Sequence, residues 1–342
     1  MEYRFLGQTG LRVSALSLGS MTFGGSGSPF FEGVGGVDQK TANQMIDICL
    51  DRGINLVDTA DVYSRGISEE MIGKALRSKR DKMLVATKCH GRMSDEVNDL
   101  GQSRHHIVNS CDASLRRLGT DYIDIYQVHG YDAYTSLSET LGALTDLVRQ
   151  GKVRYIGCSN LSAWQLMKAL SVSERANLSR FACLQANYSL VAREAEYELL
   201  PLCEDQRLGF VVWSPLAGGY LTGKYHSQAG TSHHGRRSAV GDPGSIDEER
   251  GQSILATMTD IAAQHNASVS QVALNYLLAR ADVTSVLVGA RTIDQLIDNF
   301  ACIEWSLGPG ELDALDTVSA TPSPYPYWHQ RKYNRARFRV ST

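Results

Sequence analysis

The sequence lacks the features that mark secreted, membrane-spanning and zinc-binding proteins. Its seven cysteines are odd in number and form no C-x-x-C pair, which argues against a disulfide scaffold and a zinc site. The first residues, MEYRFLGQTG, hold no apolar stretch of signal-peptide length. No apolar run reaches membrane-spanning length. We therefore expect a cytoplasmic protein with reduced thiols and no metal site.

An excess of charge of either sign is also absent. The chain holds 34 basic and 37 acidic residues, for a formal net charge of -3. This balance gives no reason to expect binding to nucleic acid or to a membrane surface. The 342 residues are 43% hydrophobic and 21% charged, as in ordinary globular proteins. No linker or low-complexity tract interrupts the chain, so we expect residues 1–342 to form a single domain. Whether this domain forms a homo-oligomer stays open.

A glycine-rich phosphate turn is missing as well. The segment Gly24–Gly36 is rich in glycine but never spells G-x-G-x-x-G, the signature of an open dinucleotide-binding sheet. We interpret it as a flexible loop, which a barrel would place at its catalytic face, within reach of a substrate.

What the chain does contain is an alternation of short apolar segments with helical ones. Tyr3–Leu6 and Leu11–Val13 flank a turn-rich Gly7–Gly10, which predicts a hairpin. Eight strands are then expected, at Ala15–Ser20, Asn55–Ala60, Met83–Lys88, Tyr122–His129, Arg154–Asn160, Cys183–Ser189, Gly209–Ser214 and Ser285–Ala290. Eight strand–helix units after a hairpin favour an α/β fold of the closed (β/α)8 barrel type, a TIM barrel.

Helix boundaries and long loops are also visible. The apolar stripe from Ala42 to Leu50 predicts a helix that Gly53 ends, Ser103 starts a helix that Gly119 ends, and Ser136 with Glu139 predicts a capping box. Gly91–Gln102, His226–Ile246 and the tail Ser323–Thr342 show no periodicity. Long loops on a barrel are frequently functional.

Four polar side chains stand at the ends of three consecutive strands. Active sites of such barrels lie at the carboxyl ends of the strands, where Asp58, Lys88 and His129 are expected, with Tyr63 in the loop after Asp58. Each alone has an ordinary structural explanation, such as a turn, a packing tyrosine or a core histidine. Together they indicate a site.

This set suits protonation of an oxygen that gains negative charge. A free tyrosine has a pKa of about 10, which a nearby ammonium lowers. Asp58 would keep Lys88 charged, and His129 would bond the substrate oxygen. No Ser or Cys nucleophile has a base in a recognisable motif, which argues against acyl transfer.

The sequence resembles the aldo-keto reductases. The similarity rests on Asp58–Tyr63 (DTADVY), Ala86–Lys88 (ATK), Tyr122–His129 (YIDIYQVH) and Gly151–Asn160 (GKVRYIGCSN), and it extends from the hairpin to about Asn299. It implies reversible hydride transfer between NADPH (less often NADH) and an aldehyde or ketone, with Asp58, Tyr63, Lys88 and His129 as the catalytic set. Cys158 stands where the family often has valine.

The resemblance also implies cofactor contacts. It assigns Ser159, Asn160 and Gln185 to the nicotinamide carboxamide and Trp213 to the ring. It assigns Ser214, Pro215, Leu216, Gly218, Leu221 and Lys224 to the pyrophosphate, and Gly289, Arg291, Gln295 and Asn299 to the adenosine end. Independently, Arg291 stands at the start of the helix expected over Thr292–Asn299, where the macrodipole disfavours a cation unless an anion is bound. We therefore expect Arg291 to bind a 2′-phosphate, with NADPH as the preferred cofactor.

The substrate pocket is expected to be apolar. Its candidate residues are Met21, Phe23, His90, Tyr131, Tyr327 and Trp328, the last two on a tail, residues 320–342, placed near the barrel mouth.

Two alternatives stay open at this point. Proteins similar to this family include auxiliary subunits of potassium channels, although the chain begins almost at the hairpin, with no extra segment to act on a partner. The other alternative is a hydrolase or aldolase in which Lys88 forms a Schiff base; pairing with Asp58 argues against it, since a nucleophilic lysine must be neutral.

Overall fold

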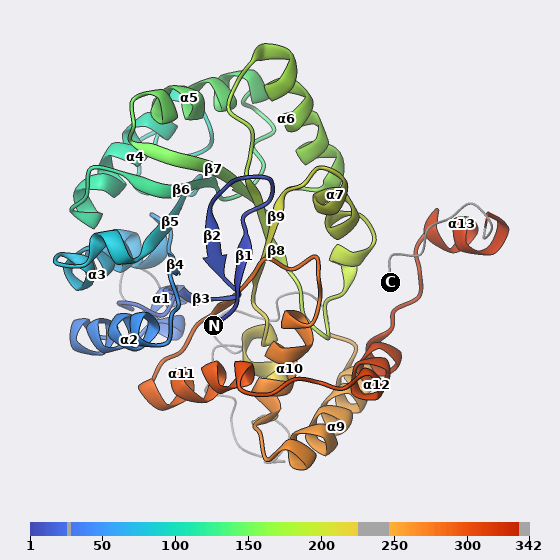
Figure 1. Cartoon of the computed structure of the whole chain (residues 1–342). Helices are drawn as coiled ribbons and strands as arrows, with labels where there is room; N and C mark the ends of the chain where they lie inside the picture. Colours follow the sequence, from blue (N-terminus) through green and yellow to red (C-terminus); the bar gives the residue numbers. More distant parts are fainter. Residues whose placement is uncertain (26–28, 225–245, 335–342) are drawn as a thin grey trace.

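The structure is a closed barrel of eight parallel strands inside a ring of helices (Figure 1). The computed structural model describes residues 1–25, 29–224 and 246–334. Around the barrel the strands follow the order β10-β3-β4-β5-β6-β7-β8-β9, which confirms the predicted (β/α)8 fold. The strands are β3 (Leu16–Gly19), β4 (Leu56–Asp58), β5 (Leu84–Cys89), β6 (Ile123–Val128), β7 (Val153–Ser159), β8 (Cys183–Asn187), β9 (Gly209–Trp213) and β10 (Ser285–Val288).

The helices form on the apolar stripes that the sequence shows. They are α1 (Pro29–Val34), α2 (Gln39–Asp51), α3 (Ile67–Leu76), α4 (Arg104–Leu118), α5 (Leu137–Arg149), α6 (Ala163–Ala176), α7 (Leu199–Asp205), α9 (Glu248–His265), α10 (Val269–Leu278), α11 (Ile293–Phe300), α12 (Pro309–Ser319) and α13 (Tyr327–Tyr333). In α2 the buried side chains lie on one face, and the Asp38 carboxylate caps the first turn.

One of the predicted helix caps is only half formed. Ser136 accepts a hydrogen bond from the Glu139 N–H, as a capping box requires. The Glu139 carboxylate, however, accepts from the N–H of Arg104, the first residue of α4, at 2.9 Å. Glu139 thus links α5 to the start of α4, where Ser103 is the N-cap as predicted.

The predicted hairpin closes the amino end of the barrel. Strands β1 (Tyr3–Phe5) and β2 (Arg12–Ser14) pair antiparallel, and they cross the barrel end in Figure 1. Leu6 and Val13 are buried with Leu56 and other side chains of the barrel interior. Gly7 has a positive φ, and a Cβ there would lie 2.5 Å from the Arg207 carbonyl oxygen, so this turn needs glycine.

The segment Gly24–Gly36, expected to be a flexible loop, contains the short helix α1. Its glycines allow two backbone stretches to touch at the base of the helix. A Cβ on Gly35 would lie 2.4 Å from the Gly25 Cα, and the Gly36 N–H donates to the Gly24 carbonyl at 2.6 Å. The glycines therefore serve close backbone packing rather than flexibility. Of the other expected loops, Gly91–Gln102 forms no helix or strand, and His226–Ile246 lies outside the described residues except for Ile246.

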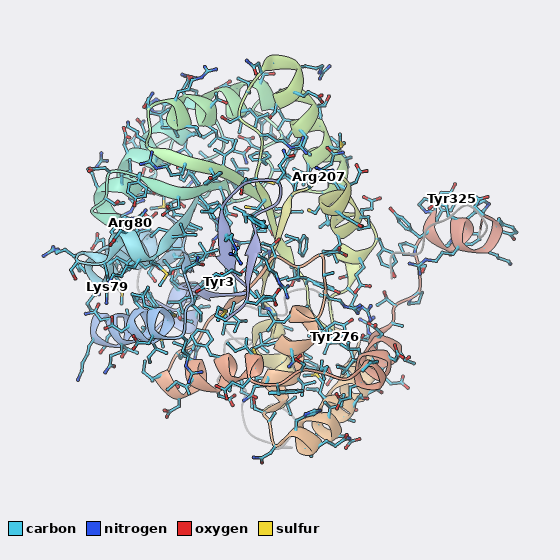
Figure 2. All side chains as sticks on the ribbon, in the orientation of Figure 1. Tyr3, Lys79, Arg80, Arg207, Tyr276 and Tyr325 are labelled. Atoms are coloured by element: carbon cyan, nitrogen blue, oxygen red, sulfur yellow. The ribbon has the colours of Figure 1, made fainter. Side chains whose placement is uncertain are left out.

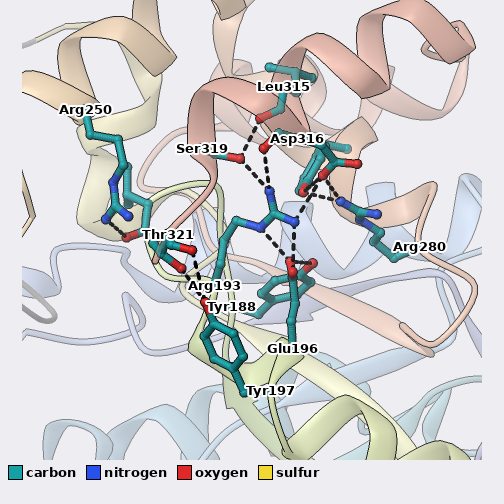
Figure 3. Close-up of polar contacts among 12 residues, drawn as sticks. Tyr188, Arg193, Glu196, Tyr197, Arg250, Arg280, Leu315, Asp316, Ser319 and Thr321 are labelled. Atoms are coloured by element: carbon teal, nitrogen blue, oxygen red, sulfur yellow. Dashed lines mark hydrogen bonds and ion pairs between the residues drawn. The ribbon is translucent and has the colours of Figure 1, made fainter. Parts of the chain in front are cut away.

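The C-terminal part is fastened to the barrel as far as Thr321 and then leaves it. Figure 3 shows Arg193 bonded to Glu196 and, across on α12, to Asp316 and Ser319. Beyond Thr321 the chain leads to α13, which stands apart from the ring of helices in Figure 1, and Tyr325 stands out with it in Figure 2.

No helix within the described ranges is both long enough and apolar enough to cross a membrane. All seven cysteines lie within these ranges, and each is a buried free thiol. That residues 1–342 form a single domain stays a prediction.

Two helical glycines give a test of the packing between α3 and α4. A Cβ at Gly73 would lie 2.4 Å from the backbone oxygen of Leu118, whereas one at Gly142, in α5, would meet nothing within 4 Å. We expect Gly73→Ala to lower the free energy of unfolding by about 1–3 kcal/mol. Gly142→Ala, the matched control, should raise it by about 0.5–1 kcal/mol. Denaturant titration measures both, and equal effects would contradict the close approach of α3 to α4.

Candidate active site

The site is built by the alternation of side chains along the barrel strands. Successive side chains of a strand face opposite sides, so residues two apart share a side. An apolar layer inside the barrel consists of Leu56, Ala86, Ile125, Cys183, Val211 and Leu287. Two residues further along the same strands come Asp58, Lys88, Gln127, Gln185, Trp213 and Gly289. The polar layer therefore lies directly above the apolar layer, at the carboxyl end of the barrel.

Lys88 is the centre of this layer. Its side chain is fully buried, and its ammonium group forms an ion pair with Asp58. It also donates to the Thr59 carbonyl at 2.8 Å. Burial lowers the pKa of Lys88, but Asp58 and Tyr63 raise it by more, so that the net shift is upward. Lys88 is therefore a fixed cation.

Asp58 is held from three sides. One carboxylate oxygen accepts from Lys88, and the other accepts from the side-chain amides of Gln127 at 3.1 Å and Gln185 at 2.8 Å. A buried carboxylate needs such donors to stay charged.

Tyr63 projects toward the same point from the turn after β4. It begins η1 (Tyr63–Gly66), where Ser64 and Arg65 both have positive φ. The Tyr63 hydroxyl lies 3.4 Å from the Lys88 ammonium, which also lies 5.0 Å from the tyrosine ring centre. Strained turns of this kind are frequent at sites where a side chain must be aimed.

His129 follows β6, and its ring centre lies 5.9 Å from that of Tyr63. Burial, and then the charge of Lys88, lower the pKa of His129 to about 3. The imidazole is therefore neutral at physiological pH, with one N–H to donate. The structure thus brings together all four of the residues expected from the sequence.

Above these four side chains opens a cavity of about 670 Å³. Its wall includes Asp58, Tyr63 and His129 and runs from Ser159 past Trp213 to Asn299. Of the residues that the resemblance assigns to a cofactor, all but Leu221 line this cavity; Leu221 is fully buried in the core.

Three features of the wall fit a nicotinamide dinucleotide. The Ser159 hydroxyl is buried without a hydrogen-bond partner among the described residues, and a carboxamide can satisfy it. Asn160 accepts from the Trp213 indole N–H at 3.0 Å and donates to the His129 carbonyl at 3.0 Å, which fixes the Trp213 ring. Leu216 has a φ of -100° and Ala217 one of +47°, and a change from right-handed to left-handed backbone favours an anion-binding turn.

The far end of the cavity is formed by Arg291 and the start of α11. Arg291 precedes the N-cap Thr292, and its backbone N–H donates to the Gln295 side chain at 3.0 Å. Its guanidinium donates to the Gly33 carbonyl, on α1, at 2.5 Å. Arg291 thus lies where an anion at a helix N-terminus would bind.

Only part of the expected substrate wall is found at the cavity. Met21 lines it, but Phe23, His90, Tyr131, Tyr327 and Trp328 do not. Phe23 is fully buried in the core. His90 contacts Gln102, and Tyr131 packs against Trp164. Tyr327 bonds Glu198, and Trp328 is 46% exposed on α13.

Three further apolar wall residues were not named individually from the sequence, although Phe30 and Phe31 lie in Gly24–Gly36, the segment expected at the catalytic face. Phe30, Phe31 and Val62 line the cavity, and the Phe31 ring centre lies 6.3 Å from that of Tyr63. Gln127 was missed as well. It lies two residues before His129, so the two side chains face the same side of the chain, and its amide donates to the Asp58 carboxylate that pairs with Lys88. The described residues contain no group of three or more His, Cys, Asp or Glu placed to hold a metal ion.

Comparison with known proteins gives a consistent result. The family model described as "Aldo/keto reductase family" matches residues 15–320. The uncharacterized oxidoreductase YrpG of Bacillus subtilis is 38% identical, over 94% of this chain and 97% of its own. The versiconal hemiacetal acetate reductase of Aspergillus parasiticus is 33% identical, over 92% and 96%. A probable voltage-gated potassium channel subunit beta of Oryza sativa subsp. japonica is 34% identical, over 93% and 96%.

The buried ion pair should respond unequally to loss of either partner. Without Lys88, Asp58 keeps two amide donors, whereas without Asp58 the ammonium keeps one carbonyl and the tyrosine. We expect Asp58→Leu to cost about 3–5 kcal/mol of unfolding free energy and Lys88→Met less. The double variant should cost less than the sum of the two. Denaturant titrations decide this, and strictly additive losses would show that the two side chains do not interact.

Proposed function

Because the chain belongs to the aldo/keto reductase family, we propose that it is an NADPH-dependent oxidoreductase that reduces an aldehyde or ketone to the alcohol, with Tyr63 as the proton donor. The observation that carries this proposal is the 3.4 Å approach of the Lys88 ammonium to the Tyr63 hydroxyl at the base of the cavity. The bound cofactor supplies the hydride that reduces the carbonyl carbon.

Tyr63 and Lys88 act as a unit in this proposal. As the carbonyl oxygen gains negative charge, the Tyr63 O–H donates its proton to it. The Lys88 cation stabilises the phenolate that remains. Asp58 keeps Lys88 charged, and the apolar layer beneath excludes water from the pair. In the reverse direction the phenolate accepts the proton of the alcohol.

His129 is proposed to orient the carbonyl oxygen. Because its pKa is lowered to about 3, it stays neutral and keeps one N–H for the substrate. A protonated imidazole beside Lys88 would add a second cation and compete with Tyr63 for the role of acid. The position of its ring against Tyr63 favours a shared contact with one oxygen atom.

The apolar part of the wall gives the substrate class. Phe30, Phe31, Met21 and Val62 line the cavity together with Tyr63, and the Phe31 ring lies against that of Tyr63. We therefore propose an aldehyde or ketone with an apolar or aromatic substituent.

The same geometry disfavours a Schiff base on Lys88, because the pairing with Asp58 raises the pKa of that lysine and keeps it protonated.

A second candidate function is favoured by one relative, which is named a probable potassium channel subunit beta. In that role the cavity would bind the cofactor as a signal. Co-purification with a membrane protein would support it.

Replacement of Tyr63 tests the reaction. With an aromatic aldehyde and NADPH, we expect Tyr63→Phe to lower kcat by about 10²–10⁴-fold, with cofactor affinity retained. The loss of NADPH absorbance measures turnover, and quenching of protein fluorescence measures binding. Tyr131→Phe is the matched control and should keep its activity, because Tyr131 does not line the cavity.

The outcomes separate the two candidate functions. Wild-type turnover that Tyr63→Phe leaves intact contradicts the assigned proton donor. NADPH binding by the wild type, without turnover of any aldehyde tried, favours the regulatory role.

Replacement of Arg291 tests the cofactor preference. A charge-assisted hydrogen bond contributes about 1.5–3 kcal/mol, so Arg291→Ala should weaken NADPH binding by about 10- to 100-fold. NADH lacks the 2′-phosphate and serves as the internal control, since its affinity should hardly change. Titration of both cofactors measures the ratio, and an equal loss for both would refute the assignment of Arg291.

A further inference from the structure

The C-terminal helix α13 is an exposed arm that the barrel does not need for its packing. Among the described residues, the Tyr327 hydroxyl makes the one hydrogen bond from α13 to a residue before Thr321, to Glu198 at 2.8 Å, while Arg331 bonds Ser323 within the tail. The Tyr327 ring also lies 5.5 Å from that of Tyr197. Tyr325, Trp328 and Tyr333 are 74%, 46% and 61% exposed. Figure 1 shows the helix well clear of its neighbours.

The arm carries charge of one sign. None of the 37 acidic residues and five of the 34 basic residues lie in residues 321–342, so the formal charge of -3 divides into +5 for this tail and -8 for residues 1–320. Arg331 and Lys332 belong to the described helix, and neither pairs with a carboxylate in the part of the chain that the structure describes. An unpaired cationic helix with exposed aromatic rings needs an anionic surface to cover it.

An acidic surface lies beside the root of the arm. It is formed by η3 (Glu194–Glu196) and the first turn of α9. The two segments are linked by a hydrogen bond of 3.4 Å from Arg250, in α9, to the carbonyl of Val191, three residues before η3. We define this acidic face by the exposed side chains Glu194, Glu198, Asp247, Glu248 and Glu249.

The two arginines of this region do not neutralise the face. Figure 3 shows Arg193 turned toward Glu196 and α12, and Arg250 turned toward the backbone. Arg193 ion-pairs with Glu196 and Asp316, which lie behind the face. Within the described ranges, none of the five carboxylates that define the face forms an ion pair.

We propose that α13 is an exchange arm: in a symmetric dimer, each copy lays α13 on the acidic face of the other. Tyr327, at the start of the arm, is bonded to Glu198, which belongs to the acidic face. The arm and the face of one copy are therefore neighbours, and a single two-fold axis places each arm on the face of the other copy. A second copy is favoured over an anionic membrane, because residues 1–320 carry -8 and anionic lipid repels them.

Sedimentation velocity of the full chain tests the dimer. At low ionic strength the mass should be twice that of the 37.5 kDa chain, and rising salt should dissociate the dimer. Arg331→Glu with Lys332→Glu should give monomers, and so should Glu194→Lys with Glu248→Lys and Glu249→Lys, which leaves the face with a net positive charge. Mixing the two variants should restore a dimer, because each arm then meets a face of opposite charge.

The matched control reverses two exposed cations elsewhere. Lys168→Glu with Arg175→Glu, on α6, changes the net charge by the same amount and should leave the dimer intact. Circular dichroism confirms that each variant is folded, and Arg331→Gln with Lys332→Gln, a milder change, should weaken the dimer less.

Three results would overturn the proposal. The wild type could be a monomer at all salt concentrations. The arm variant could remain dimeric, or the mixture could fail to associate. Binding of a monomeric wild type to phosphatidylcholine vesicles that contain phosphatidylserine, lost in the arm variant, would assign the arm to a membrane instead.

Discussion

The rest of the structure depends on the buried pair of Lys88 and Asp58. An ammonium group taken out of water costs several kcal/mol unless charge and hydrogen bonds replace the lost solvation. Here Asp58 and the Thr59 carbonyl replace it, and Gln127 and Gln185 in turn hold Asp58. The four side chains come from β4, β5, β6 and β8. One charge pair therefore fastens four of the eight strands at the end of the barrel where the cavity opens.

A second charged set, on the outer face of the same strand, positions the tyrosine. Thr87, next to Lys88, points out of the barrel and donates to Glu69 at 2.6 Å, and Arg117 holds the other oxygen of Glu69 at 2.6 Å. Glu69 lies in the first turn of α3, directly after the turn that starts at Tyr63. Nearby, burial and then the charge of Glu69 raise the pKa of Asp61 well above its usual range. The buried Lys88 pairs with Asp58 on one face of β5, and the part-buried Arg117 pairs with Glu69 on the other.

The sequence predicted best what depends on strand periodicity and worst what depends on single tertiary contacts. The eight strands, the hairpin and the meeting of Asp58, Lys88 and His129 follow from alternation and from barrel geometry, which fixes where strand ends converge. Phe23 looked like a wall residue because it follows a strand, but its turn directs it into the core. Helix α1 was missed because glycines flank it, and those glycines serve the contact between Gly25 and Gly35. The place of Tyr327 depends on Glu198, 129 residues away, and no local pattern encodes such a pairing.

The proposed catalytic residues and the residues that would select the substrate therefore lie in different parts of the chain. The polar layer is rigid because it is carried by strands packed on an apolar layer. Under the proposed function, any substrate would meet the same proton donor. Part of the wall above that layer comes from α1, a short segment with two contacts to lining residues: Phe31 lies against Tyr63, and the Gly33 carbonyl accepts a hydrogen bond from the guanidinium of Arg291. A change in α1 therefore reaches the contacts at Tyr63 and at Arg291 together, because its six residues span both. Under the proposed function, substitutions there would alter which carbonyl compound fits without disturbing the charge pair, since none of the hydrogen bonds of Lys88 and Asp58 involves α1.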